Sequence, residues 1–170
     1  MGTRGTTTVI VGGETKVSQY GQWDHYPEGQ GLVALRFLRD SGKLDALRRN
    51  AELARPALQK DFDEVADPAN KQPMWPWGDL FTDEVKAAKK AWFEKFGWAT
   101  RDTGAEILEL IADGHVPVVN LDLDKSWGEG FPTVNFDEGT FTFEYHGESN
   151  TWSLDALPTD EEFLDSYSDV

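Results

Sequence analysis

The sequence predicts an α+β fold in which an amino-terminal β-hairpin joins a carboxyl-terminal antiparallel sheet, with a central helical section between them. Three features indicate this fold. β-Branched residues fill residues 6–11, apolar residues recur at helical spacing between residues 32 and 111, and alternating segments follow residue 116. Hairpin, helices and meander in that order are typical of the α+β class. The 170 residues suit a single domain, 1–170, because a chain of this length can bury about 70% of its unfolded surface.

The first element is a hairpin over residues 6–23. Gly12 and Gly13 follow the β-branched run and supply the positive φ angles of a tight turn. Residues 16–23 then resume as the second strand. Because an isolated hairpin is only marginally stable in water, we expect it to pair with strands drawn from residues 116–155.

Helices follow the hairpin. Thr82 precedes two acidic residues, a pattern typical of a helix N-cap with negative charge in the first turn. Pro56 marks a helix boundary, and the Pro-rich residues 67–78 form a loop. The predicted helices span residues 32–42, 43–55, 57–66 and 82–96. A fifth helix is predicted to begin at Asp102 or Thr103, as the N-cap, and to end at Gly114.

Strands dominate the carboxyl-terminal section. They are predicted at residues 116–123, 133–136, 140–145 and 151–154, with turns at 137–139 and 147–150, before Pro158-Thr159 caps a short acidic helix. Asn120, Asp122 and Asp124 share one strand face, where oxygen ligands can hold a divalent cation. Polar residues on the wet face of an antiparallel strand are the more ordinary interpretation, so we predict no metal site.

Composition excludes several classes of protein. Without cysteine the chain has no disulfide, thiolate nucleophile or Cys-ligated zinc. No apolar run approaches the roughly 20 residues that span a bilayer, and the amino terminus lacks the apolar region of a secretory signal. The three histidines are dispersed, and P-loop, GxSxG and HExxH motifs are absent. We therefore predict a cytoplasmic protein that needs no cofactor and contacts no membrane.

The net charge of −15 is unevenly distributed. Residues 102–170 hold 17 Asp and Glu against one base, Lys125, whereas residues 1–101 hold 14 acids and 15 Lys and Arg. Such an acidic section repels a phosphate backbone, so direct nucleic-acid binding is not expected. The charge favours a basic partner, or else it serves solubility. If it serves recognition, its carboxylates should form a continuous surface that bases from the first section do not interrupt.

The segment QYGQWDHYPEGQG, residues 19–31, is the best candidate for a site. Its aromatic, amide and acidic side chains can stack a planar ligand, hydrogen-bond its edges and transfer a proton. The alternative is a hairpin-to-helix corner in which Trp23 and Tyr26 pack in the core and Asp24 bonds local amides. For a site, we expect Trp23 and Tyr26 to be partly buried while Asp24 and Gln30 stay accessible around one concavity. The candidate binding residues are Arg4, Tyr20, Gln22, Trp23, Asp24, Tyr26 and Gln30.

Four segments, MGTRG, QYGQWDHYPEGQG, RDTGAEILELI and LPTDEEF, together resemble a family of uncharacterised proteins from bacteriophage and bacterial genomes. Members of that family open with MGTR and carry a QYGQWDGYPxGQG-like segment. The chain departs from them at His25, where small residues are typical of the family. The resemblance implies a phage or prophage origin and a role inside a bacterial cell, but it implies no substrate.

Two functions remain open. The first is an acidic phage-type accessory protein that binds a host macromolecule, as an inhibitor of a basic or nucleic-acid-binding host factor. The alternative is a small-molecule or nucleotide-binding protein, or a hydrolase, with its site at residues 19–31. Amino-terminal nucleophile chemistry would need a cleavage that exposes Thr3, for which the sequence carries no signal. The alternative therefore rests on a site that uses Arg4, Asp24 and Gln30.

Overall fold

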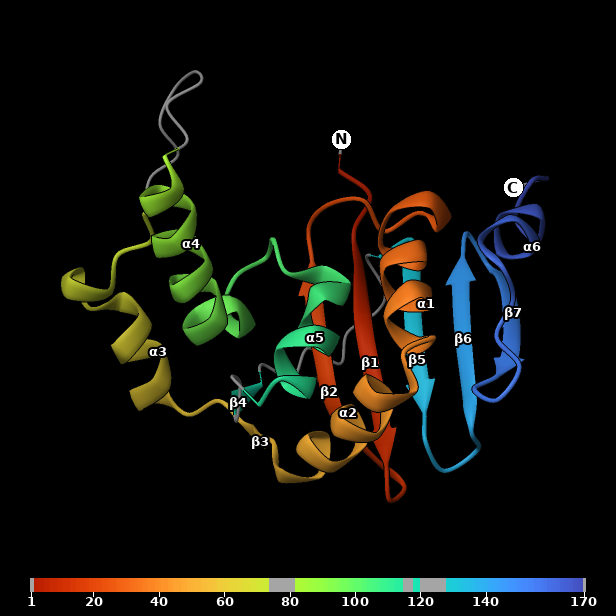
Figure 1. The fold of residues 1–170 in the computed structure, drawn as a ribbon, viewed down its shortest axis with the longest axis horizontal. Coiled ribbons are helices and arrows are strands. Elements are labelled where there is room, and N and C mark those ends of the chain that lie inside the picture. Colours follow the sequence, from red (N-terminus) through yellow and green to blue (C-terminus); the bar gives the residue numbers. More distant parts are fainter. Residues whose placement is uncertain (1, 74–81, 115–117, 120–127, 170) are drawn as a thin grey trace.

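The computed structural model describes residues 2–73, 82–114, 118–119 and 128–169. A mixed five-stranded sheet has the strand order β2-β1-β5-β6-β7 (Figure 1). Its strands are β1 (Gly5–Val11), β2 (Glu14–Gly21), β5 (Gly130–Asn135), β6 (Thr140–Tyr145) and β7 (Glu148–Ser153). All neighbouring strands are antiparallel except β1 and β5, which are parallel. The α+β prediction is confirmed, with the amino-terminal hairpin joined to a carboxyl-terminal antiparallel meander.

The turn of the first hairpin is held from outside. Gly12 and Gly13 have φ angles of 64° and 75°, as a two-residue hairpin turn requires. Their N–H groups donate to the carboxylate of Asp137 at 2.8 Å and 2.7 Å. These two hydrogen bonds lower the pKa of Asp137. The Asp137 carboxylate thus joins the β1–β2 turn to the β5–β6 turn, about a hundred and twenty residues further along the chain.

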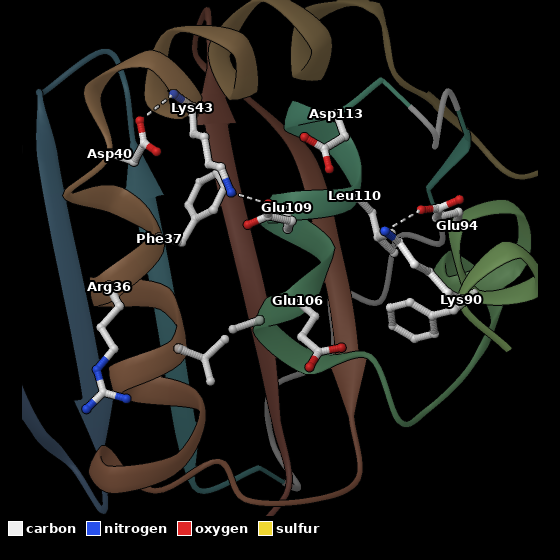
Figure 2. A pocket seen from close by; sticks show the side chains of 13 residues that line it. Arg36, Phe37, Asp40, Lys43, Lys90, Glu94, Glu106, Glu109, Leu110 and Asp113 are labelled. Atoms are coloured by element: carbon white, nitrogen blue, oxygen red, sulfur yellow. Dashed lines mark hydrogen bonds and ion pairs between the residues drawn. The ribbon is translucent and has the colours of Figure 1, made fainter. Parts of the chain in front are cut away.

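Three helices cover one face of the sheet, while two others extend to one side (Figure 1). The covering helices are α1 (Leu32–Leu38), α2 (Ser41–Leu53) and α5 (Ile107–Ala112). The outer helices, α3 (Gln59–Ala66) and α4 (Asp83–Phe96), form what we call the arm. A hollow of about 680 Å³ lies between α1, α4 and α5 (Figure 2).

Short elements complete the chain. The one-turn helices are η1 (Pro27–Gly31), η2 (Pro68–Asn70), η3 (Gly97–Ala99) and η4 (Gly104–Glu106). A separate parallel pair joins β3 (Arg55–Pro56) to β4 (Val118–Val119). No helix in the described part of the chain is long and apolar enough to cross a bilayer.

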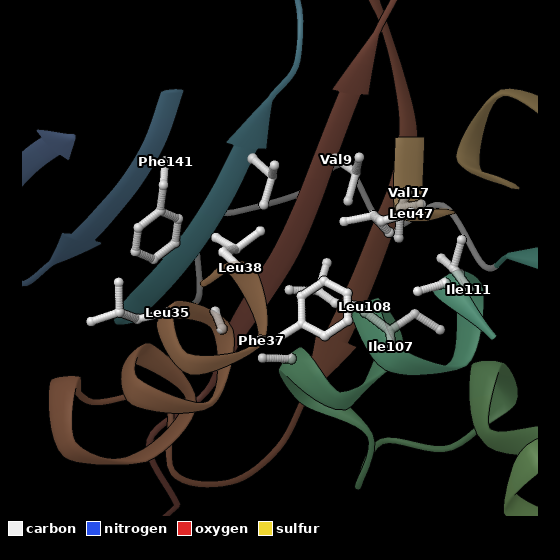
Figure 3. Close-up of a cluster of buried hydrophobic side chains, with 14 of the residues drawn as sticks. Val9, Val17, Leu35, Phe37, Leu38, Leu47, Ile107, Leu108, Ile111 and Phe141 are labelled. Carbon is white, nitrogen blue, oxygen red and sulfur yellow. The ribbon is translucent and has the colours of Figure 1, made fainter. Parts of the chain in front are cut away.

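The hydrophobic core lies between the sheet and the covering helices (Figure 3). Val9 and Val17 point from the first hairpin toward α2 and α5, and they are fully buried. Leu35 of α1, Ile107 of α5 and Phe141 of β6 are also fully buried. Each such side chain contributes about 1.5–3 kcal/mol on burial, so this layer holds most of the stabilising apolar contact.

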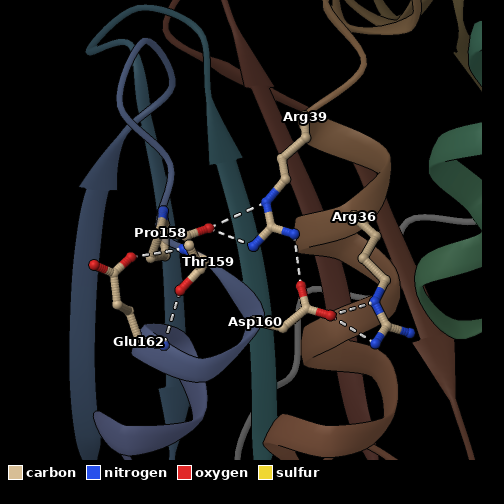
Figure 4. A network of polar contacts seen from close by, with 6 residues as sticks. All are labelled: Arg36, Arg39, Pro158, Thr159, Asp160 and Glu162. Carbon is tan, nitrogen blue, oxygen red and sulfur yellow. Dashed lines mark hydrogen bonds and ion pairs between the residues drawn. The ribbon is translucent and has the colours of Figure 1, made fainter.

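Helix α6 (Asp160–Asp165) is attached to the sheet and to α1 by distinct contacts. Phe163 is fully buried and packs against Phe143 with ring centroids 5.5 Å apart. Thr159 forms the predicted N-cap, because its hydroxyl accepts from the N–H of Glu162 at 3.2 Å. Arg36 and Arg39 both reach the carboxylate of Asp160, at 2.7 Å and 2.6 Å, and Arg39 also donates to the Pro158 carbonyl (Figure 4).

Some local predictions were correct, and others were wrong. Thr82 caps α4 as expected. Thr103, in contrast, caps nothing, because its hydroxyl donates to the Gly97 carbonyl and η4 begins the next helical section instead. The strand predicted to reach residue 23 ends at Gly21. The turn predicted at 147–150 is the pair His146-Gly147, and Glu148 already belongs to β7.

One predicted strand falls mainly outside the described residues. Of residues 116–123, the structure describes 118–119, which pair with Arg55-Pro56 and not with the hairpin. Asn120, Asp122 and Asp124 lie outside the described residues. The hairpin pairs with the later strands through β1 and β5.

Candidate functional site

The predicted segment 19–31 packs against the connection between η3 and α5. The N–H of Gln22 donates to the Arg101 carbonyl at 2.8 Å. The indole N–H of Trp23 donates to Asp102 at 3.0 Å, although the Trp23 side chain is 47% exposed. The side-chain oxygen of Gln30 accepts from the N–H of Ala105 at 2.7 Å. Gln22, Trp23 and Gln30 therefore make contacts that fasten a corner of the fold.

The other predicted site residues are spread over this corner. The side chains of Arg4 and Asp24 are exposed, and Tyr20 hydrogen-bonds Gln22. Asp24 has a φ of 61°, which fits its position at a tight bend. Its charge raises the pKa of Tyr26, whose side chain is half-buried. None of the seven predicted binding residues lines the 680 Å³ hollow or two smaller ones, of about 410 Å³ and 400 Å³.

His25 lies at the centre of the corner and is fully buried. Its Nδ1–H donates to the Gly130 carbonyl at 3.0 Å. A Cβ added to Gly21 would lie 2.1 Å from His25 Nε2, and one added to Gly5 would lie 2.2 Å from Nδ1. Burial lowers the pKa of His25 to about 4. The imidazole thus fits between glycine backbones as a neutral structural group, out of reach of a ligand.

Two residues of the segment do line a hollow. Pro27 and Glu28, in η1, form one wall of a space of about 410 Å³, which we call the acidic hollow. Its other lining residues come from the end of β6 and from α6 and the turn after it: Tyr145, Leu164, Asp165, Tyr167 and Ser168. The hollow therefore lies where the predicted segment meets the acidic carboxyl-terminal section.

The walls of the acidic hollow are fixed by core packing. The Tyr167 hydroxyl donates to the Phe143 carbonyl at 2.5 Å, and its ring meets the Phe143 ring edge-on, with centroids 5.5 Å apart. Burial raises the pKa of Tyr167 to about 12. Tyr145, half-buried at the end of β6, has its ring centroid 4.3 Å from that of His146. Two aromatic rings are thus held rigidly beside the opening.

The electrostatic character of this hollow is negative. The Glu28 and Asp165 side chains are both exposed. Burial raises the pKa of Tyr145, and the nearby charges of Glu129 and Glu28 raise it further. No Lys or Arg is among the described residues that line the hollow. Carboxylates beside aromatic and aliphatic walls are suited to a cationic group with an apolar stem.

Sequence reasoning identified only part of this arrangement. Glu28 stands inside the predicted segment, and Asp165 belongs to the acidic section. Tyr145 and Tyr167 were not predicted, because only the folded chain brings residues 27–28, 145 and 164–168 together. The one available signal was the pair of tyrosines, Tyr145 and Tyr167, each within three residues of an acidic residue.

Comparisons with family models, curated proteins and solved structures give no match for this chain. Among the described residues, no group of three or more His, Asp or Glu side chains is arranged to hold a metal ion. Functional inference therefore depends on the geometry of the hollows.

Proposed function

We propose that this protein acts by binding a basic protein partner, and that the acidic hollow accepts a lysine or arginine side chain of that partner. The observation that carries the proposal is the placement of Glu28 and Asp165 at a hollow walled by Tyr145 and Leu164, without a basic side chain among its described lining residues. The volume of about 410 Å³ is in the range of small binding sites and accommodates one long side chain.

Each wall has a counterpart in such a side chain. The aliphatic stem of lysine or arginine packs on apolar surface while its head stays polar, and here Pro27 and Leu164 offer that surface. The cationic head pairs with Glu28 and Asp165 through charge-assisted hydrogen bonds. The Tyr145 ring adds a cation–π contact at the same opening.

The wider acidic charge is not continuous. Arg36 and Arg39 contact Asp160, and Lys43 contacts Glu109, so bases from the first section interrupt the carboxylates on that side of the molecule. The expectation of an uninterrupted acidic surface is therefore wrong there. By that criterion the charge of the carboxyl-terminal section as a whole serves solubility, and the proposal rests on the acidic hollow.

The bacteriophage resemblance bears on what the partner is. Inside a bacterial cell, basic surfaces belong chiefly to proteins that bind nucleic acid. We therefore propose a host factor of that kind as the partner, with the protein occupying its cationic surface as an inhibitor. This assignment is supported by the sequence resemblance and by charge, whereas the proposal of a lysine or arginine side chain is supported by the lining of the acidic hollow.

The test measures binding of a fluorescent lysine-rich peptide and an arginine-rich peptide by anisotropy, with a lysine-acetylated peptide of the same sequence as the neutral probe. We expect the cationic peptides to bind, the acetylated peptide not to bind, and affinity to fall as salt rises. The double variant Glu28→Gln/Asp165→Asn should weaken binding by about ten-fold.

A matched control separates the hollow from net charge. The double variant Asp45→Asn/Glu52→Gln also removes two negative charges, but from exposed positions on α2. It should leave affinity within about two-fold, because exposed charges at a distance are screened. Equal weakening by both double variants, or no binding of either cationic peptide, would overturn the proposal.

A further inference from the structure

The hollow between α1, α4 and α5 adjoins a second one. The first, of about 680 Å³, is bounded by α1 on one side and α5 on the other (Figure 2). The second, of about 400 Å³, lies along α4 toward Lys86. Lys90, Phe93 and Glu106 line both hollows, and we call the two hollows together the trough. This trough is separate from the acidic hollow and shares no lining residue with it.

The floor of the trough is apolar. Phe37 and Leu110 are almost fully buried yet present their outer atoms to the larger space, and Val33 is 37% exposed there. Phe93, half-buried on α4, closes the same floor from the arm. An apolar floor under a charged rim is typical of a small-molecule site, and each of the two volumes lies within the usual range.

Most charges on the rim already have partners. Lys43 pairs with Glu109, and Arg36 contacts Asp160 outside the trough. Lys90 reaches Glu94 only at 3.7 Å, with its own side chain 78% exposed. Such an exposed pair is weak and can be exchanged for another contact.

Two carboxylates on this rim, those of Asp113 and Glu106, form no hydrogen bond or ion pair among the described residues; Asp113 interacts with the charge of Lys43, which leaves Glu106. No side chain among the described residues hydrogen-bonds or ion-pairs with its carboxylate. Partial desolvation by its surroundings raises the pKa of Glu106, as expected for a carboxylate beside apolar walls without a counter-ion. In Figure 2 the Glu106 side chain extends from the end of η4, where α5 begins, into the hollow.

We propose that the trough binds a zwitterionic ligand of the amino-acid or dipeptide class that carries a large apolar side chain. The ammonium group of the ligand pairs with Glu106, and its carboxylate pairs with Lys90, at the junction that both residues line. The apolar side chain lies on Phe37, Phe93 and Leu110. A single amino acid fills only part of the space, so a dipeptide with two apolar side chains is the better match.

The test uses four probes that differ by one group each: the dipeptide Leu-Phe, free phenylalanine, phenethylamine without a carboxylate, and phenylpropionate without an amine. Binding is measured by calorimetry and by two-dimensional NMR of the intact chain. We expect Leu-Phe to bind most tightly and each single-charge probe at least about ten-fold more weakly. Chemical-shift changes should centre on Phe93, Glu106 and Lys90.

Variants then assign the two charges. Glu106→Gln should reduce affinity for Leu-Phe by about ten-fold, and Lys90→Gln should reduce it by a smaller factor because that side chain is more exposed. Glu52→Gln, on the exposed face of α2, serves as the matched control and should leave affinity unchanged. Circular dichroism shows whether each variant is folded. If Glu106→Gln does not fold, Lys90→Gln still tests the proposal.

Three outcomes would overturn the proposal. One is absence of binding by all four probes at millimolar concentration. Another is equal affinity for phenethylamine and Leu-Phe, which would exclude recognition of the carboxylate. The third is full affinity in both Glu106→Gln and Lys90→Gln. None of these results would affect binding of cationic peptides at the acidic hollow, so the two proposals fail or hold independently.

Discussion

The helices that cover the sheet and the helices of the arm are stabilised in different ways. In α1, five of seven residues are buried, whereas α4 buries only Phe96 and every residue of α3 stays at least partly exposed. The arm depends on contacts at its edges, such as the Arg55–Asp61 ion pair at 2.7 Å and the Trp92 N–H donating to the Asn70 carbonyl at 2.7 Å. One layer thus owes its stability to desolvation and the other to local hydrogen bonds.

A core substitution should give the largest effect that separates the two regions. Phe141→Ala removes a fully buried ring between β6 and the helices and should cost about 3–5 kcal/mol of unfolding free energy. Phe62→Ala in the arm removes a 38% exposed ring, packed edge-on against Trp98, and should cost about 1 kcal/mol. Urea denaturation measures both. A similar loss of unfolding free energy in the two variants would contradict the view that the sheet layer and the arm are stabilised differently.

Acid should have the second-largest effect. As pH falls, it should destabilise the sheet layer before it affects the arm. His25 has a pKa of about 4 in the folded protein against about 6.5 when unfolded, so the unfolded chain binds a proton in that interval and the folded chain does not. Stability is therefore complete above pH 6.5 and falls by about 3 kcal/mol as pH drops to 4. NMR titration of the His25 ring provides the measurement. A midpoint near 6.5 would show that the imidazole is not held as described.

A smaller effect is expected at the start of the arm helix α4. The Thr82 hydroxyl accepts from the N–H of Val85 at 3.3 Å, so Thr82→Ala should cost about 1 kcal/mol and increase amide exchange in the first turn. Thr82→Ser keeps the hydroxyl oxygen and should behave like the wild type. If the first-turn amides of α4 exchange at the same rate in the Thr82→Ala and Thr82→Ser variants, the cap does not stabilise the arm.

The smallest effect concerns the partly buried Arg55–Asp61 pair. Hydrogen bonds from Arg55 lower the pKa of Asp61 to about 2, so the pair should persist until pH falls below the ordinary value of 3.8 and be lost toward 2. Asp61→Asn should fray α3 at neutral pH without changing the core, as seen by amide exchange in α3 compared with β6. If α3 in the wild type already lost its protection against amide exchange between pH 6.5 and 4, the prediction that the pair persists to pH 3.8 would be wrong.

Sequence reasoning succeeded where structure is decided locally. Gly12-Gly13 and the caps at Thr82 and Thr159 depend on a few neighbouring residues, and all three are present as predicted. The Thr103 cap failed because the Gly97 carbonyl, six residues earlier, captures its hydroxyl. A tertiary contact overrode the local preference.

Long-range arrangement could not be read in the same way. The parallel pairing of β1 with β5 brings Gly130 against His25, and no periodicity in either segment indicates it. The same applies to the acidic hollow, since Glu28 and Asp165 meet only after α6 has docked. Residues 19–31 were predicted as a candidate site; Trp23 and Gln30 fasten the corner, whereas Pro27 and Glu28 line a hollow.

The close fit of His25 also makes several positions of the sequence interdependent during evolution. Gly21 excludes a methyl group chiefly because the imidazole occupies that space; without the ring, the nearest atom is the Cα of Gly104, 3.0 Å away. Gly5 is different, since its Cβ would also lie 1.8 Å from the Gly130 carbonyl oxygen whatever residue stands at position 25. A lineage with a small residue at position 25 is therefore freer to acquire alanine at position 21, and one that has gained histidine loses that freedom. The order in which such substitutions are acquired decides which ancestral intermediates fold.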